Sequence, residues 1–112
     1  MTVVLIDDHP VLSMGLVQGL QNRGVEAAAM QPAEPTEFIE QLAAAPFTPR
    51  LAVMDLAMPN VSHTPDLVEA VASLGIPVIM LSGSDDENAL ASCLLAGAMA
   101  IMSKDESVEE IL

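Results

Sequence analysis

The sequence has no tyrosine or tryptophan, one cysteine and only three basic residues. The single Cys93 cannot form a disulfide within the chain, and its position in an apolar helical pattern predicts a buried thiol in a reducing compartment. Sixteen acidic residues against Arg23, Arg50 and Lys104 give a formal net charge of -13. This charge repels nucleic-acid phosphates and anionic lipids, so we expect no direct binding of DNA by this segment.

Long apolar runs and a basic N-terminal segment are also missing. The longest apolar run, from Cys93 to Met102, is about half as long as a membrane span requires. The acidic pair Asp7 and Asp8 follows closely after the N-terminus, where a signal peptide would carry its apolar core. We therefore expect no signal peptide, no membrane anchor and a cytoplasmic location.

Apolar residues are abundant, at 52% of the chain against 17% charged residues, and this composition predicts a folded protein. A length of 112 residues predicts one domain. Short apolar runs predict buried strands at Val3–Ile6, Val25–Met30, Leu51–Met54, Pro77–Leu81 and Met99–Met102. Between the runs, apolar residues spaced three and four apart predict helices, with stripes at Leu12, Leu16 and Leu20; at Phe38, Ile39 and Leu42; at Leu67, Val68, Val71 and Leu74; and at Leu90, Cys93 and Leu94.

Residues typical of helix ends agree with this division. Prolines stand at two expected helix starts, Pro10 and Pro65, and glycines follow three expected helix ends, Gly24, Gly75 and Gly97. The alternation predicts an α/β fold: a doubly wound, five-stranded parallel sheet in a (βα)5 three-layer sandwich. The fifth helix would begin at Ser107 and have only six residues before the sequence stops, so we expect it to be truncated.

Polar side chains follow the predicted strands at one end of the sheet, where open α/β sheets bind their ligands. Asp7 and Asp8 follow the first strand, Asp55 the third, Ser82 the fourth and Lys104 the fifth. Crowded carboxylates persist only beside a cation, and oxygen-only ligands favour Mg²⁺. With the ammonium and the hydroxyl, this set could clamp a phosphoryl group, which makes Asp55 the candidate nucleophile.

These motifs resemble the receiver domain of two-component response regulators, the CheY-like domain, over essentially the whole chain. The matching elements are Asp7-Asp8, the stretch from Asp55 to Pro59, Ser82-Gly83 and Lys104. The stretches 4–10 and 97–105 resemble the subfamily that carries a C-terminal helix-turn-helix of the LuxR/NarL type. The resemblance implies a receiver domain over residues 1–112, and a DNA-binding effector domain in the full-length protein that is absent from this sequence.

The resemblance also implies roles for the individual residues. Asp55 would accept a phosphoryl group from a phosphohistidine of a sensor histidine kinase. Asp8 and Asp55, with Asp7 largely through water and the backbone carbonyl of Ala57, would hold Mg²⁺. Ser82 and Lys104 would bind the phosphoryl oxygens. The chain would then be a regulatory domain, catalysing only phosphoryl transfer and dephosphorylation at Asp55.

The expected partners are the kinase and a second copy of the chain, with DNA reached only through the missing domain and no membrane contact. In this family a switch couples the hydroxyl at Ser82 to an aromatic residue three positions before Lys104, where this chain has Ile101. Because isoleucine offers neither a ring nor a hydroxyl, an alternative stays open: a dimerisation or protein-binding module that works without phosphorylation.

His9 directly follows the acidic pair and could be a metal ligand. However, the next residue opens a helix, and the resembled family leaves this side chain outside the ligand set. A loop or capping role for His9 is therefore favoured.

Overall fold

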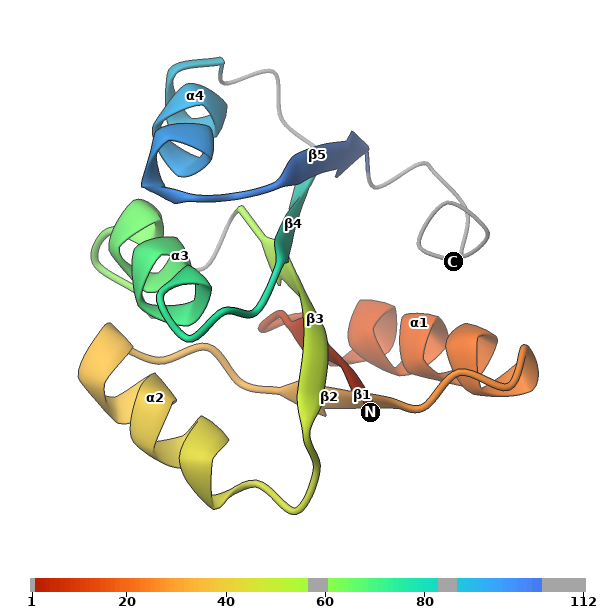
Figure 1. The fold of residues 1–112 in the computed structure, drawn as a ribbon. Coiled ribbons are helices and arrows are strands. Elements are labelled where there is room, and N and C mark those ends of the chain that lie inside the picture. The colour runs from red at the N-terminus through yellow and green to blue at the C-terminus, as the bar shows by residue number, and fades with distance from the viewer. Residues whose placement is uncertain (1, 57–60, 83–86, 104–112) are drawn as a thin grey trace.

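The protein was analysed as a computed structural model, which describes residues 2–56, 61–82 and 87–103. Strands and helices alternate along this part of the chain (Figure 1). Their bounds are β1 (Thr2–Ile6), α1 (Pro10–Asn22), β2 (Ala27–Met30), α2 (Pro35–Ala44), β3 (Pro49–Asp55), α3 (Thr64–Ala72), β4 (Val78–Ser82), α4 (Glu87–Ala96) and β5 (Ala100–Ser103). The predicted fifth helix falls at residues outside the described part.

The five strands form one parallel sheet in the order β2-β1-β3-β4-β5. The chain winds from β1 outward to β2, returns to β3 on the other side of β1, and then continues to β4 and β5. Helix α1 covers one face of the sheet, and α2, α3 and α4 cover the other (Figure 1). The predicted doubly wound parallel fold is therefore confirmed, and the winding direction reverses between β1 and β3.

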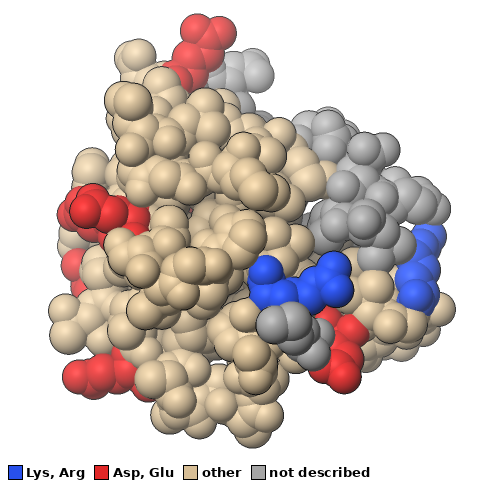
Figure 2. All heavy atoms as spheres, viewed as in Figure 1, with Lys and Arg blue, Asp and Glu red and all other residues tan. Residues whose placement is uncertain are grey.

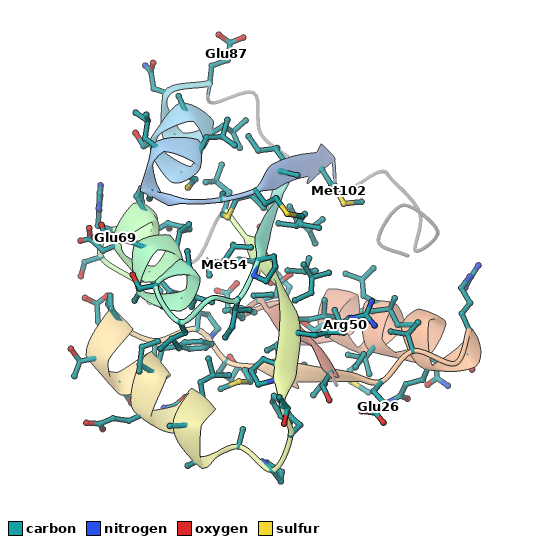
Figure 3. All side chains as sticks on the ribbon, in the orientation of Figure 1. Glu26, Arg50, Met54, Glu69, Glu87 and Met102 are labelled. Carbon is teal, nitrogen blue, oxygen red and sulfur yellow. The ribbon has the colours of Figure 1, made fainter. Side chains whose placement is uncertain are left out.

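Both faces of the sheet carry an apolar core, because alternate residues of a strand point to opposite sides. Val4 and Ile6 of β1 pack in the cluster under α2, α3 and α4, whereas Val3 and Leu5 pack in the cluster that contains Leu20 of α1. Figure 3 shows the side chains of the described residues between the layers, among them Met54 beside α3. The central strands are thus buried on both faces, and this packing fixes the positions of the strand ends.

The element boundaries differ from the sequence prediction at several points. Strand β2 begins at Ala27 rather than Val25, because the backbone N–H of Val25 donates to the carbonyl of Leu20 in the turn that closes α1. Helix α3 ends at Ala72, so Leu74, which the sequence placed in the apolar stripe of this helix, lies beyond the helix and is 53% exposed. Leu94 of α4 is also exposed, whereas Cys93 is buried as predicted.

Gly97 ends α4 with a positive φ of 124°, and Gly24 ends α1 with a φ of 79°. A Cβ atom on Gly97 would lie 3.1 Å from the Cβ of Ala72, which is closer than ordinary van der Waals contact, but a Cβ on Gly24 would meet nothing within 4 Å. The two positions thus share a backbone requirement for glycine. Only Gly97 adds a steric requirement, since it lies where α4 passes α3.

We expect Gly97→Ala to destabilise the fold by about 2 kcal/mol or more, because both backbone strain and the contact with Ala72 oppose it. Gly24→Ala should cost about 1 kcal/mol, from backbone strain alone. Urea unfolding of the two variants measures the difference. Equal losses would show that the approach of α3 and α4 does not restrict position 97.

Candidate functional site

The acidic cluster lies at the carboxyl ends of the two strands between which the winding reverses. Asp55 is the last residue of β3, and Asp7 directly follows β1. Because Ile6 pairs with Met54 in the parallel register, the residues that follow these two are neighbours. Asp7 and Asp55 are 5% and 1% exposed, and Asp8 is partly buried. The expected convergence of the three carboxylates is therefore observed.

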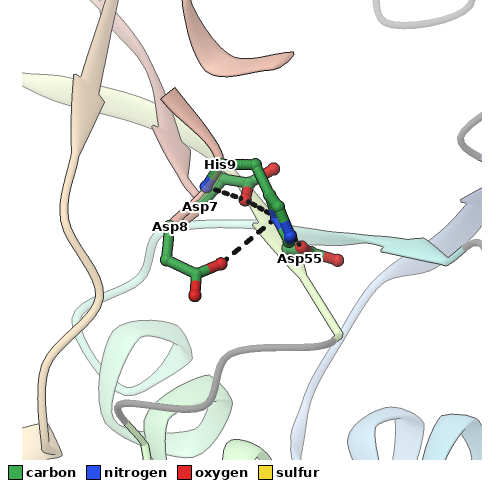
Figure 4. A group of neighbouring side chains, drawn as sticks. All are labelled: Asp7, Asp8, His9 and Asp55. Carbon is green, nitrogen blue, oxygen red and sulfur yellow. Dashed lines mark hydrogen bonds and ion pairs between the residues drawn. The ribbon is translucent and has the colours of Figure 1, made fainter. Parts of the chain in front are cut away.

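The imidazole of His9 lies among these three carboxylates (Figure 4). Its Nδ1 atom is 2.7 Å from Oδ1 of Asp7, 3.2 Å from Oδ1 of Asp8 and 3.2 Å from Oδ2 of Asp55. The backbone N–H of His9 also donates to Oδ1 of Asp7, at 2.8 Å. His9 is thus attached to Asp7 through both its backbone and its ring.

His9 lies in the loop between β1 and α1 as expected, but the expected capping by its side chain is not observed. His9 does occupy the N-cap position of α1, but its side chain makes no capping hydrogen bond to that helix. The ring turns back to the carboxylates because they offer charged acceptors, which bind a ring N–H more strongly than neutral groups do. The signal in the sequence was the adjacency of His9 to two acids, with Pro10 starting the helix immediately afterwards.

The cluster raises the pKa of His9. The hydrogen bond with Asp7 is the main cause, followed by the negative charge of that carboxylate. The charges of Asp8 and Asp55 contribute less, and partial loss of solvent around the ring opposes the shift. Protonated His9 therefore places a positive charge at the point where the three carboxylates meet.

The oxygen atoms of the cluster suit a divalent cation. Oδ2 of Asp7 and Oδ1 of Asp8 are buried and have no hydrogen-bond partner among the described residues. Asp7, Asp8, His9 and Asp55 each offer a ligand atom, and these atoms all lie within 4.8 Å of one another. Buried oxygens without donors are costly unless a cation satisfies them. The three carboxylates of this group thus fit Mg²⁺, which prefers oxygen ligands.

Of the other predicted site residues, the structure describes only the backbone of Ser82 and the whole of Ile101. Ser82 ends β4, one position beyond Leu81, which pairs with Asp55 across the sheet. Its hydroxyl, Ala57 and Lys104 lie outside the described part of the molecule. Ile101 of β5 pairs with Met80 and is partly buried against the core under α2, α3 and α4.

The other acidic residues of the described part do not form a second cluster of this kind. Figure 2 shows acidic side chains spread over separate elements of that face rather than gathered together. Across the described ranges, Asp7, Asp8, His9 and Asp55 form the one group of three or more potential metal ligands. The cluster therefore reflects the positions of the strand ends and not only the overall negative charge.

The molecule is thus a doubly wound α/β protein with an acidic cluster at its switch point, where open α/β sheets generally bind their ligands. The family model of the response regulator receiver domain matches residues 3–112. The chain therefore belongs to the response regulator receiver family, which confirms the resemblance seen in its motifs. Members of this family generally bind Mg²⁺ at an acidic pocket.

Curated relatives are transcription regulators. UhpA, a transcriptional regulatory protein of Escherichia coli, is 33% identical over 114 residues, which cover 99% of this chain and 55% of UhpA. BvgA of Bordetella pertussis, named as a positive transcription regulator of virulence factors, is 29% identical over 113 residues, which cover 98% of this chain and 52% of BvgA. The chain thus spans about half the length of the curated relatives it matches.

Solved structures agree with the fold. The signal receiver domain of the response regulator NarL from Mycobacterium tuberculosis superposes with a TM-score of 0.76 at 26% identity, covering 98% of this chain and 88% of that chain. The crystal structure of FixJ-N superposes with a TM-score of 0.80 at 24% identity, covering 98% of this chain and 86% of that chain.

In the described segments of this chain, none of the helices combines the length and hydrophobicity of a membrane span.

We expect the ring of His9 to titrate above the usual histidine value of about 6.5 in metal-free protein. Since the folded pKa is raised, protonation of His9 stabilises the fold fully below about pH 6.5, and this contribution is lost as the pH rises through the folded pKa. Asp7→Asn should lower the pKa, because it removes the negative charge of Asp7 and leaves at most a weaker, neutral hydrogen bond to the ring. NMR titration of the histidine ring protons measures it.

Glu26→Gln is the control, because Glu26 contacts Thr2 at the opposite end of β1. That variant should leave the titration of His9 unchanged. A pKa of His9 that stays the same in Asp7→Asn would contradict the assignment of Asp7 as the dominant partner.

Proposed function

We propose that this chain is the phosphoacceptor receiver domain of a two-component response regulator and that Asp55 accepts the phosphoryl group from a sensor histidine kinase. One observation carries the proposal: the carboxylate of Asp55 ends a central strand beside Asp7 and Asp8, in a chain of the receiver family. The transfer forms a bond between an oxygen of Asp55 and phosphorus while the phosphorus–nitrogen bond of the phosphohistidine breaks. The bonding electrons remain on the donor nitrogen, which can then take up a proton.

The burial of Asp55 constrains access to it. With only 1% of its surface exposed, Asp55 can meet a phosphoryl donor only after neighbouring side chains move. His9 is one such neighbour, because its ring contacts Oδ2 of Asp55 and is itself 54% exposed. Displacement of this ring would uncover an oxygen of the acceptor.

Asp8 and Asp55, with Asp7 largely through water and the backbone carbonyl of Ala57, would hold Mg²⁺. The bound ion supplies positive charge that offsets the carboxylates and the oxygens of the incoming phosphoryl group. Ser82 and Lys104 would bind those oxygens. The buried Oδ2 of Asp7, which has no hydrogen-bond partner among the described residues, supports this part of the proposal.

The signal would leave the site through Ser82 and Ile101. Ser82 ends β4, and Ile101 lies on the adjacent strand with its side chain partly buried against the core. A repacking of this aliphatic side chain would replace the aromatic rotation of the family. The output would be transcription, through a C-terminal DNA-binding domain, as the names of the relatives and their greater length suggest.

We expect acetyl phosphate with Mg²⁺ to add one phosphoryl group to the protein, seen as one mass increment by intact mass spectrometry. Asp55→Asn should abolish the increment because it removes the nucleophilic oxygen. Asp66→Asn is the matched control, since Asp66 is an exposed carboxylate on α3 that contacts His63.

Phosphorylation that survives Asp55→Asn would refute the assignment of the acceptor. A lack of phosphorylation in the unmodified protein, with Mg²⁺ bound, would favour the alternative module that works without phosphorylation.

We also expect Mg²⁺ alone to raise the Tm. At about 100 times Kd, mass action adds about 2.7 kcal/mol to the free energy of unfolding, which raises the Tm of a domain of this size by about 10 °C. Asp8→Asn should remove most of this increase because it removes a charged ligand, and Asp66→Asn should retain it. Thermal melts over a Mg²⁺ series provide the measurement. A full response in Asp8→Asn would exclude Asp8 from the metal site.

A further inference from the structure

We infer that Nδ1 of His9 is a fourth, nitrogen ligand of the acidic cluster, so that Asp7, Asp8, His9 and Asp55 bind a late first-row divalent ion such as Zn²⁺ more tightly than Mg²⁺. The inference shares its carboxylates with the Mg²⁺ site and rests on that part of the proposed function. It adds a ligand that the receiver resemblance leaves outside the set.

The positions of the side chains carry the inference. Nδ1 of His9 lies 2.7, 3.2 and 3.2 Å from one oxygen each of Asp7, Asp8 and Asp55. Around a metal with bonds of about 2.1 Å, neighbouring ligand atoms are about 3.0 Å apart in octahedral and about 3.4 Å apart in tetrahedral geometry. The distances from the nitrogen to the three oxygens are thus close to those between neighbouring ligands of one ion, and all four ligand atoms lie within 4.8 Å of one another.

The buried carboxylate of Asp7, which also supports the Mg²⁺ site, points to a bound cation. Asp7 is 5% exposed, and its second oxygen is buried without a hydrogen-bond partner among the described residues. His9 satisfies only Oδ1 of this carboxylate. The cluster therefore retains a buried acceptor that neither the ring nor the backbone of His9 uses.

The nitrogen decides which ion the cluster prefers. Mg²⁺ selects oxygen ligands and gains little from an imidazole. Imidazole suits Zn²⁺, Co²⁺, Ni²⁺ and Cu²⁺, which also bind a given set of ligands more tightly than the earlier metals do. Three carboxylates and one imidazole therefore favour a late transition metal.

His63 provides an internal comparison, because it occupies the same position in another helix. Each histidine is the N-cap residue of a helix that has one proline among its first two residues. Neither histidine side chain makes a capping hydrogen bond. However, Nδ1 of His63 contacts a single carboxylate, that of Asp66, at 3.2 Å, and both side chains are more than half exposed. His63 therefore shares the helix-start position of His9 but lacks the three surrounding carboxylates.

The test compares His9→Ser with His63→Ser. Serine is a preferred N-cap residue, so both variants should fold at least as well as the original chain. Isothermal titration with Co²⁺, Zn²⁺ and Mg²⁺ at about pH 8 gives the affinities, since a pH above the usual histidine value of about 6.5 favours the neutral ring that can bind a metal. The visible absorption of bound Co²⁺ reports its ligands independently of affinity.

We expect His9→Ser to weaken Co²⁺ and Zn²⁺ binding by at least about tenfold, since even the loss of an outer partner of a metal ligand costs about 10–100-fold. Its Co²⁺ spectrum should shift as an oxygen replaces the nitrogen. Mg²⁺ binding should change by less than about threefold, consistent with its preference for oxygen ligands. His63→Ser should match the unmodified protein in every measurement.

Three outcomes would overturn the inference. Unchanged or tighter Co²⁺ binding in His9→Ser would show that the ring only competes with the ion, and the carboxylate site for Mg²⁺ would stand. Equal weakening for Co²⁺ and Mg²⁺ would show that His9 orders the carboxylates without ligating. Failure of the unmodified protein to bind any of the three ions would refute both this inference and the proposed Mg²⁺ site.

Discussion

The mutual repulsion of three carboxylates at the ends of two neighbouring strands is the constraint on which the site depends. Asp7 and Asp55 are almost fully buried, so water screens their charges poorly. They cannot move far apart, because β1 and β3 pair along their length up to Ile6 and Met54. A cation must therefore balance the charge, and the ring of His9 can supply one where the oxygens meet.

The apolar layers on both faces of the sheet make this crowding possible. Val4 and Ile6 pack under one layer of helices, and Val3 and Leu5 pack against α1. These contacts hold β1 between its neighbouring strands despite the repulsion between the carboxylates at its end. The stability of the core thus opposes the repulsion at the strand ends.

The same geometry links the site to the rest of the fold. Asp55, Leu81 and Met102 lie in register across β3, β4 and β5, so a change of charge at Asp55 acts beside β4, which carries Ser82 and separates β3 from the strand of Ile101. Ile101 faces the core beneath the helices rather than a ligand. A signal from the site would therefore travel as a change of packing.

The sequence by itself determined the strands, the helices, the fold class and the strand ends at which the acids lie. These features depend on local patterns: apolar runs that end in aspartate, apolar spacing of three and four, and glycine after a helix. Only the tertiary structure decided the strand order and which residues of β1 face α1, because a strand that is apolar on both faces has no alternation to read. It also decided the orientation of His9. His9 and His63 both precede proline-bearing helix starts, yet only His9 has three carboxylates from two strands within reach of its ring.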